Sequence, residues 1–471
     1  MKVIPIVPAP AEGEPQSLYE SQKKVYPRTV QGLFARWRWG FVFLTQLVFY
    51  GLPWLQWGER QAVLFDLGAR RFYLFGWVLY PQDFIYLTGL LVVSALSLFL
   101  FTAVAGRLWC GFACPQTVYT EMFLWIERKV EGERHERMKL DGAPFSLEKL
   151  VKKWFKHLLW IGLALWTGFT FVGYFTPIVE LGMEFLQTRM SSWEVFWVFF
   201  YGFATYGNAG FMREQVCKYM CPYARFQSAM LDRDTLIVSY DAKRGEPRGS
   251  RPRSLADFRS KGLGACIDCS LCVQVCPTGI DIRKGLQLEC IGCAACVDVC
   301  DGVMEKMKYE PGLIRFTTQN ALEKGYGRDG ILARVLRPRV IVYTLILGAI
   351  AVGLAISLAM RTPLKVDVVR DRAALARIVP GGRLENVYRL QVMNATERTQ
   401  RYRIRAEGLA GLAVASDTEI EVPAAQSRWV PVRLQIPYGS AAAGSHAIHF
   451  DIGTVDGDAH VREKSVFLVP R

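Results

Sequence analysis

The sequence predicts a multi-domain chain in which an α-helical membrane bundle carries an inserted α+β domain and ends in an all-β sandwich. Two long segments, 84–105 and 340–360, contain no charged residue, and about 20 apolar residues suffice to cross the hydrocarbon core as a helix. All 12 cysteines lie in regularly spaced motifs in the middle of the chain. From about residue 365 onward, apolar and polar residues alternate, which is the pattern of half-buried β-strands.

The composition excludes several classes of protein. The 471 residues are enough for about three domains, and they combine a net charge of +14 with 51% apolar residues. A soluble nucleic-acid-binding protein would not need so much apolar surface, and no basic helix here is interleaved with aromatic residues. Charged residues make up only 21% of the chain, which excludes disorder over most of its length. The N-terminal residues contain no apolar core of a signal peptide, so we expect no cleaved secretory signal.

Three further segments are candidate spans, although each is less uniformly apolar than the two charge-free segments. They are residues 41–57, 157–179 and 193–212. The last has Glu194 at its edge, and it contains Gly202, Gly207 and Gly210, which favour close contact between helices. Together with the charge-free segments they predict about five membrane spans. A buried helix of a soluble domain is the alternative interpretation.

The distribution of basic residues predicts which side of the membrane each segment faces. Segment 107–156 is rich in lysine and arginine, whereas 177–192 contains only Arg189. Because these residues are in excess on the cytoplasmic side, we expect 107–156, the N-terminal segment and 213–339 to face the cytoplasm. The tail then lies in the periplasm of a bacterium, on the outer face of the inner membrane, although Arg361 beyond the last span argues mildly against this.

A C-x3-C-P motif follows each of the first two pairs of spans, at a period of 107 residues. The first motif contains Cys110 and Cys114, and the second contains Cys217 and Cys221. A parallel repeat of this kind places equivalent ends of the two hairpins at one membrane face. We therefore expect the four cysteines to meet at the cytoplasmic surface, where they could bind an iron–sulfur cluster, copper or zinc. The alternative is that they are small buried side chains, as free cysteines often are.

The strongest chemical signal lies in 262–312, where two C-x2-C-x2-C-x3-C runs follow one another. Such runs hold [4Fe–4S] clusters in two-cluster ferredoxins, and the fourth cysteine of each run ligates the other cluster. The spacing therefore predicts two cluster-binding sets, the first of Cys266, Cys269, Cys272 and Cys300, and the second of Cys276, Cys290, Cys293 and Cys296. Structural zinc uses pairs of cysteines in place of such runs, and disulfides are disfavoured in a reducing cytoplasm. The second run ends in Asp301 where the first has Pro277, and we expect ligation to survive this difference.

Residues 241–261 are rich in arginine, glycine and proline, a composition typical of flexible linkers. Such a linker tethers the ferredoxin domain near the membrane face that carries the C-x3-C-P motifs. Its basic residues could also contact anionic lipid, but a solvated linker is the simpler interpretation.

The tail alternates apolar and polar residues, for example at 387–392 and 429–434. This pattern predicts a small β-sandwich, which has no cysteine and therefore no disulfide. His446, His449 and His460 suggest a metal site, but residues three apart on a strand point to opposite faces. We therefore expect ordinary surface histidines and a docking role for the sandwich.

The cysteine motifs and their flanking residues resemble the FixG/CcoG family, and the resemblance extends from about residue 25 to the end. It rests on Trp109-Cys-Gly-Phe-Ala-Cys114-Pro, on Cys217-Lys-Tyr-Met-Cys221-Pro-Tyr-Ala-Arg and on the run from Cys276 to Cys296. It implies membrane spans, a cytoplasmic two-cluster ferredoxin domain and an exported immunoglobulin-like tail. It also implies an accessory role in assembling cbb3-type cytochrome c oxidase, in which Cu(II) is reduced to Cu(I) for the copper centre. Copper would then bind near the four C-x3-C-P cysteines, and the partners would be oxidase subunits or a copper chaperone or transporter.

Two other functions stay open. One is a quinol-linked polyferredoxin that feeds electrons to a periplasmic reductase, and the other is a non-enzymatic assembly scaffold or copper carrier. The sequence contains no flavin or nicotinamide fingerprint, so we expect electrons to arrive from a partner.

The domain boundaries follow from these segments. They are 1–40 for a cytoplasmic N-terminal segment, 41–240 for a four-span membrane region, 241–261 for the linker, 262–312 for the ferredoxin domain, 313–339 for a cytoplasmic connector, 340–360 for the fifth span and 361–471 for the periplasmic immunoglobulin-like domain.

Overall fold

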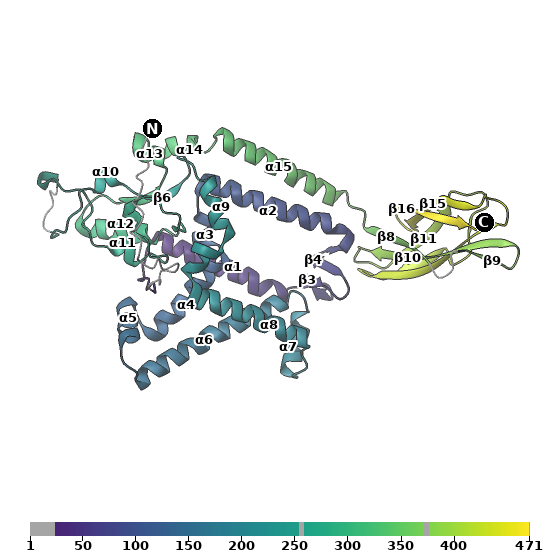
Figure 1. Ribbon diagram of the computed structural model, residues 1–471, viewed down its shortest axis with the longest axis horizontal. Helices are drawn as coiled ribbons and strands as arrows, with labels where there is room; N and C mark the ends of the chain where they lie inside the picture. Colours follow the sequence, from purple (N-terminus) through teal and green to yellow (C-terminus); the bar gives the residue numbers. More distant parts are fainter. Residues whose placement is uncertain (1–23, 254–258, 372–375, 471) are drawn as a thin grey trace, which may run out of the picture.

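The computed structural model describes residues 24–253, 259–371 and 376–470. Residues 1–23, on which the expectation about a signal peptide falls, lie outside the described residues. The long helices form the middle of the molecule, with a domain of short helices and strands at one end and a β-sandwich at the other (Figure 1). The predicted combination of a helical region, an inserted domain and a C-terminal sandwich is therefore confirmed.

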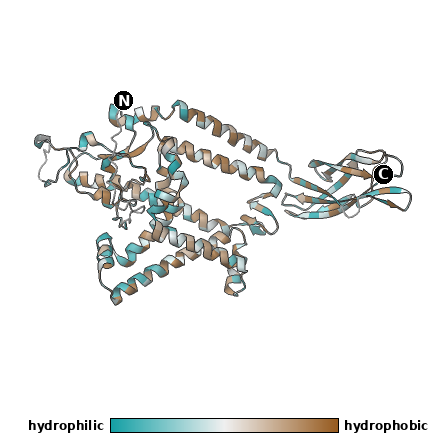
Figure 2. Cartoon of the chain, viewed as in Figure 1, coloured by the Kyte–Doolittle hydropathy of each residue, from teal (hydrophilic) through white to brown (hydrophobic). Residues whose placement is uncertain are grey.

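Three helices of the described chain are long and apolar enough to cross a membrane. They are α2 (Phe84–Ala105, preceded by the short helix η2, Pro81–Asp83), α6 (Leu147–Val172) and α15 (Pro338–Ala359). Their apolar composition is visible in Figure 2. α2 and α15 run side by side (Figure 1), and a Cβ atom added at Gly89 would lie 2.6 Å from Leu354 Cδ1. The Tyr86 hydroxyl donates a 3.1 Å hydrogen bond to the Ser357 carbonyl, which helps to fix the register of the pair.

Arginines hold both ends of α15. At its N-terminal end, Arg337 donates to the Asp232 carboxylate at 3.0 Å and to the carbonyl of Ala103 in α2. Just beyond its C-terminal end, Arg361 pairs at 2.7 Å with Asp83, whose side chain is only 2% exposed. Because Asp83 directly precedes α2, the α2–α15 pair is tied together near both ends.

The prediction of five spans is not confirmed, and three predicted segments differ in bounds from the helices of the structure. α6 (Leu147–Val172) begins and ends earlier than the predicted segment 157–179, whose last residues form a turn and the start of α7. α1 spans Leu33–Gly51 and so begins before the predicted segment 41–57, whose last residues form a 3-10 turn and the start of a hairpin. α8 spans only Ser192–Thr205 and is followed by a π-helix over Tyr206–Met212, so 193–212 is not one regular helix. The 14 residues of α8 are about 21 Å long, which is shorter than the hydrocarbon core of roughly 30 Å.

α6 and α8 pack closely because glycines let their backbones approach one another. A Cβ atom added at Gly168 would lie 2.2 Å from the Val198 carbonyl oxygen. Gly202 and Gly210 also pack against α6, as the sequence predicts for this segment, whereas Gly207 has no such neighbour within 4 Å.

Shorter helices connect the long ones, and two of them, α4 and α5, contribute to a buried group of charges. They are α3 (Leu108–Phe112), α4 (Pro115–Glu131), α5 (Arg134–Gly142), α7 (Ile178–Leu186), the π-helix η4 (Val216–Met220), α9 (Pro222–Met230), α13 (Gln319–Lys324) and α14 (Arg328–Ala333). Glu127 of α4 is fully buried and pairs with Arg137 at 3.2 Å and Arg213 at 2.9 Å. The paired charges join α4 and α5 to the segment that carries the second C-x3-C-P motif.

A small sheet that the sequence analysis did not predict lies between α1 and α2. It consists of β3 (Val63–Asp66), β4 (Arg71–Leu74) and β5 (Trp77–Leu79), and it follows the hairpin of β1 (Gln56–Trp57) and β2 (Arg60–Gln61). Leu64, Val78 and Tyr80 share a buried apolar cluster with Met393 of the sandwich. The Tyr80 hydroxyl also donates to the Asn394 carbonyl at 3.0 Å. The sheet therefore connects the helices to the sandwich.

The tail is the predicted β-sandwich. One sheet has the order β12-β14-β10-β8 with β9 paired to β10, and the other has the order β13-β11-β15-β16. The strands are β8 (Leu364–Arg370), β9 (Arg377–Val379), β10 (Arg383–Asn394), β11 (Gln400–Glu407), β12 (Ala413–Val414), β13 (Glu419–Val422), β14 (Ser427–Pro437), β15 (Gly444–Thr454) and β16 (His460–Val469). Tyr388, Val432, Phe450 and Phe467 are fully buried between the sheets. The three histidines lie on β15 and β16, and in the described chain no group of metal-binding side chains includes them.

The inserted domain is larger than the predicted 262–312. β6 (Ile237–Tyr240) lies before this range and pairs antiparallel with β7 (Ile314–Thr317), which lies after it. The helices α11 (Leu271–Gln274) and α12 (Ala295–Met307) lie between these strands in the sequence.

The prediction that 241–261 is a flexible linker is wrong for its described part. Residues 242–245 form the short helix α10, and the Cys266 amide donates to the Gly245 carbonyl at 3.3 Å. The Gly249 amide donates to the Cys266 carbonyl at 3.3 Å. These backbone hydrogen bonds attach the segment to the first cysteine run, and only residues 254–258 of it lie outside the described residues.

Candidate iron–sulfur sites and adjoining thiols

The two cysteine runs of the inserted domain fold into loops with the same backbone pattern. In the first loop Asp268 and Ser270 have positive φ angles of 54° and 53°, and in the second Gly292 and Ala294 have 70° and 56°. Each pair lies at the same two positions of its Cys-x2-Cys-x2-Cys sequence. Alternation of right- and left-handed conformations turns successive N–H groups toward one side of a loop, where they favour an anion. A thiolate-bound cluster is such an anion.

The first cavity is lined by the cysteines that the spacing assigns to one cluster. Cys266, Cys269, Cys272 and Cys300 all contribute to its wall, together with Tyr240 and Arg283 among other residues. Cys300 comes from α12 in the second run, so the fourth cysteine of that run lies at the cavity of the first run, where the spacing places it. Cys269 is the exposed member of the set.

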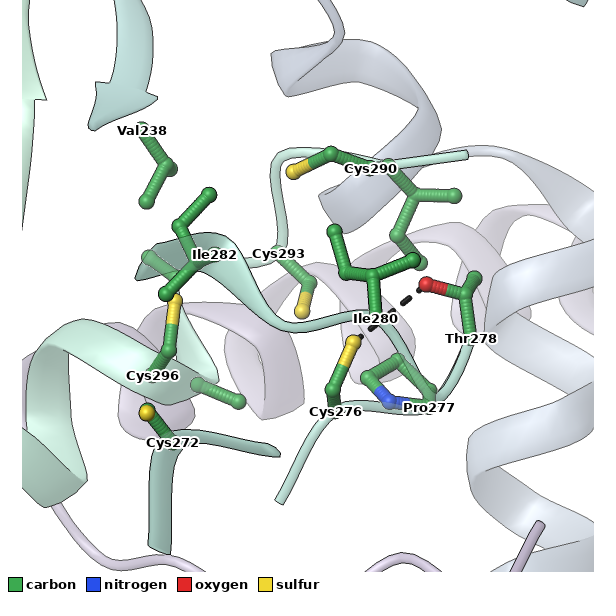
Figure 3. A pocket seen from close by; sticks show the side chains of 13 residues that line it. Val238, Cys272, Cys276, Pro277, Thr278, Ile280, Ile282, Cys290, Cys293 and Cys296 are labelled. Carbon is green, nitrogen blue, oxygen red and sulfur yellow. Dashed lines mark hydrogen bonds between the residues drawn. The ribbon is translucent and has the colours of Figure 1, made fainter. Parts of the chain in front are cut away.

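The second cavity, drawn in Figure 3, is lined by the other predicted set. Its wall includes Cys276, Cys290, Cys293 and Cys296. Cys272 lines both this cavity and the first one. The fourth cysteine of the first run, Cys276, thus lies with the second run, and its sulfur is 3.3 Å from the Thr278 hydroxyl. In the described chain no three of these side chains already converge on one metal position. Ligation by both sets therefore stays a prediction.

The chemistry of both cavities fits a [4Fe–4S] group. Burial raises the pKa of the Cys290 and Cys300 thiols to about 12 and that of Cys272 to about 11. Buried thiolates therefore need a strongly positive partner, and bound metal ions deprotonate coordinating thiols. Two groups of four sulfur donors with N–H groups on the same loops meet this requirement.

One cysteine of each C-x3-C-P motif packs beside the second cysteine set. Cys110 and Cys217 contact a buried apolar cluster that includes Cys293. Burial raises the pKa of Cys110 to about 11, and the nearby thiols of Cys114 and Cys221 contribute to this rise. The Gln227 side-chain amide donates to the Cys110 sulfur at 3.3 Å. The structure therefore brings the two motifs together, as their repeated position predicts.

Glycines form the contact between α3 and the second cysteine run. A Cβ atom added at Gly111 would lie 2.7 Å from both the Cα and the N atom of Cys293. A Cβ atom added at Gly292 would lie 3.1 Å from the carbonyl oxygen of Arg107. The cysteine spacing does not predict this contact, but Gly292 stands where the first run has Asp268, and a glycine at that position is a signal of close approach.

The N-terminus of α1 is bound to α12, a second contact that the sequence analysis missed. The Asp298 carboxylate accepts hydrogen bonds from the backbone N–H groups of Phe34 at 3.1 Å and Ala35 at 2.7 Å. Asp298 lies between the last two cysteines of the second run, Cys296 and Cys300. The helix of the cluster domain thus caps the first long helix.

Comparison with known proteins agrees with this arrangement. Residues 87–132 match a family model described as a 4Fe-4S binding domain, and 212–319 match one described as a 4Fe-4S dicluster domain. Residues 354–470 match the model of the IG-like fold at the C-terminal of FixG. The first match includes the first C-x3-C-P motif, and the second includes the other motif and both cysteine runs.

Three curated proteins are similar to the chain along most of their length. The nitrogen fixation protein FixG of Rhizobium meliloti (strain 1021) is 35% identical to it, with 95% of this chain and 92% of that protein covered. Protein RdxA and Protein RdxB of Cereibacter sphaeroides are 36% and 37% identical to it, each with 91% of this chain and 92% of the relative covered. The chain carries 4Fe–4S domains suited to iron–sulfur electron transfer, and it belongs to the FixG family.

Proposed function

We propose that this chain passes single electrons from its ferredoxin domain to the C-x3-C-P thiols, where they reduce Cu(II) to Cu(I). The observation that carries the proposal is the backbone contact of Gly111 with Cys293. Gly111 follows Cys110 directly, so a thiol of the first motif lies one residue away from a contact with the second cysteine set. The Cu(I) produced would serve the assembly of a cbb3-type cytochrome c oxidase.

Bound [4Fe–4S] groups supply one-electron redox chemistry. The residues of the chain position the rest of the reaction. Cys269 is exposed, so the first set is the one that an external electron donor can approach. The second set lies between the first set and α3, and Cys272 lines both cavities. This order gives a direction of transfer from the exposed set toward the C-x3-C-P motifs.

The C-x3-C-P thiols suit the product of the reaction better than its substrate. Thiolates prefer soft Cu(I), whereas Cu(II) prefers nitrogen and oxygen ligands. The buried thiols of Cys110 and Cys217 have raised pKa values, so they release protons when copper binds. Each Cu(II) ion takes one electron and becomes Cu(I), which the thiolates retain until a copper chaperone or transporter removes it.

We further propose that the ferredoxin domain faces the cytoplasm and the sandwich faces the periplasm of a bacterial inner membrane. The two domains lie at opposite ends of α2 and α15 in Figure 1, which supports this arrangement. Arg334 and Arg337 before α15 and Arg339 in its first turn lie at the ferredoxin end, as the excess of positive charge on the cytoplasmic side requires. Protease added to spheroplasts should remove the sandwich and spare the ferredoxin domain, and cleavage of the ferredoxin domain alone would contradict this topology.

The test of copper reduction uses the purified full-length protein without oxygen. Its clusters are reduced, excess reductant is removed, and Cu(II) is added with a chelator specific for Cu(I). We expect cluster reoxidation and Cu(I) formation with one copper ion per electron. Reduced clusters that do not react with Cu(II) would reject the proposal.

Two variants separate the two parts of the proposed route. The double variant Cys110→Ala, Cys114→Ala should keep the absorbance and iron of both ferredoxin clusters but reduce Cu(II) at least tenfold more slowly. Cys269→Ser should lose the iron of one cluster. Copper reduction at the parent rate in the double variant would exclude these thiols as the copper site.

A further inference from the structure

Arg107 lies at the junction of the three cysteine-bearing segments. It follows α2 and directly precedes α3, three residues before Cys110. Its side chain donates a 2.6 Å hydrogen bond to the Ala224 carbonyl, three residues after Cys221. Its own carbonyl group lies beneath Gly292 of the second cysteine run. The residue therefore contacts the second C-x3-C-P segment and the second cluster loop while it belongs to the first motif.

The charge of Arg107 is buried and lacks a carboxylate partner. The residue is 8% exposed, and in the described chain no aspartate or glutamate lies within ion-pair distance of its guanidinium group. Arg283 at the first cavity differs, because it pairs with Asp281 at 2.8 Å and also with Asp268. A buried charge without a partner is costly, so another anion must compensate Arg107.

The nearby anions that can do so are thiolates of two different sites. Burial raises the pKa values of Cys110, Cys217 and Cys290, and the positive charge of Arg107 opposes this rise at each of them. Cys110 and Cys217 belong to the C-x3-C-P motifs, and Cys290 belongs to the second cluster set. Arg107 also lines a small cavity together with Cys290 and Gly292.

We propose that Arg107 is the shared counter-charge of the second cluster and the C-x3-C-P thiolates, and that it makes the second cluster the easier of the two to reduce. An added electron increases the negative charge of a cluster, and a nearby cation that no carboxylate neutralises stabilises that state in a medium of low dielectric constant. At the first cavity two aspartates cancel the charge of Arg283. Electrons therefore move downhill from the first cluster to the second. This inference rests on the proposed electron route but not on copper as the acceptor.

The test is an EPR-monitored redox titration of the full-length protein and of three variants. In Arg107→Gln the charge is lost, in Arg107→Lys it is kept, and Arg225→Gln removes an exposed arginine beside the same motif as a matched control. The Cys269→Ser variant, which lacks the first cluster, assigns the two signals. Iron content and absorbance establish that each variant carries its clusters.

For Arg107→Gln we expect at least a tenfold fall in the equilibrium constant for reducing the second cluster, which is about 59 mV for a one-electron couple. The first cluster should keep its potential, and Arg107→Lys and Arg225→Gln should keep both potentials. An unchanged second potential, or an equal shift of both clusters, in Arg107→Gln would overturn the proposal. If Arg107→Gln does not retain its clusters, the Arg107→Lys variant decides. A lower potential of the second cluster in Arg107→Lys, which keeps the positive charge, contradicts the proposal. A parental potential in this variant supports it.

The titration also distinguishes this proposal from the proposed copper reduction. If Arg107→Gln shifts the potential of the second cluster but the parent protein does not reduce copper, copper is rejected as the acceptor and the role of Arg107 is supported. If the potentials are unchanged but the parent protein reduces copper, the role of Arg107 is rejected and copper reduction is supported.

Discussion

Replacing Asp298 by alanine tests the contact that holds the cluster domain against the first long helix. The carboxylate accepts two backbone hydrogen bonds from the first turn of α1, and the residue is 9% exposed. Hydrogen bonds to a charged group contribute roughly 1.5–3 kcal/mol each, and an anion at a helix N-terminus adds about 0.3–1 kcal/mol. Because water can replace part of these bonds when the turn opens, we expect Asp298→Ala to lower the local opening free energy by about 3 kcal/mol.

Hydrogen–deuterium exchange of the peptide that contains Phe34 and Ala35 measures this effect. A loss of about 3 kcal/mol corresponds to faster exchange by roughly a hundredfold. Asp298→Asn retains one acceptor oxygen and should have a smaller effect. Glu305→Ala removes an exposed carboxylate from the same helix and serves as the control. Exchange in Asp298→Ala that equals exchange in Glu305→Ala would refute the cap.

Two further predictions concern the opposite end of the molecule. Arg361→Gln leaves the buried Asp83 carboxylate with the Tyr80 N–H at 3.1 Å and with Lys365 at 3.5 Å as its remaining cationic partner in the described chain, so we expect a loss of about 3 kcal/mol. A lower thermal midpoint, restored in part by Arg361→Lys, would support this, and a parental midpoint would reject it. In the sandwich, burial of Glu385 is outweighed by hydrogen bonds from Gln435 and Arg377, which hold the pKa of this carboxyl below its usual value. The contribution of Glu385 to the free energy of unfolding is therefore full above the unfolded pKa of about 4.3, and it is lost as the pH falls through the lower folded pKa. The free energy of unfolding of the sandwich should therefore depend less on acidic pH in Glu385→Gln. An identical pH profile would contradict this.

The cysteine sets were the most predictable part of the site. A spacing of two residues places three cysteines on one tight loop, so the grouping of Cys290, Cys293 and Cys296 follows from local geometry. The exchange of Cys276 and Cys300 follows from the same pattern, and each lines the cavity of the other run. The charge-free segments were equally predictable, because α2 and α15 match them nearly residue for residue.

The parts that sequence patterns missed depend on contacts between distant segments. Arg36 and Arg38 made the start of α1 unlike a membrane span, yet Arg38 is buried and approaches Glu121 to 3.8 Å. The composition of 241–261 is that of a linker. However, the backbone of Cys266 is hydrogen-bonded to the Gly245 carbonyl and the Gly249 amide of this segment. The strands between α1 and α2 are short, and they pack against Met393 of the sandwich, which lies more than 300 residues later in the chain. Local periodicity contains no information about such partners.

Because Arg337 and Arg361 anchor α15 near its two ends, they constrain the number of residues that this helix can have. α15 has 22 residues, which is about 33 Å of helix, and each added residue rotates the C-terminal part of the helix by about 100° relative to its N-terminal part. With one residue inserted in its middle, Arg337 and Arg361 could no longer reach Asp232 and Asp83 at once without a break in the helix. Three or four inserted residues would restore the angle but extend the helix by about one turn, or roughly 5 Å. Both the length of the helix and the relative rotation of its two ends are therefore fixed. Relatives should differ in the sequence of this helix far more readily than in its number of residues.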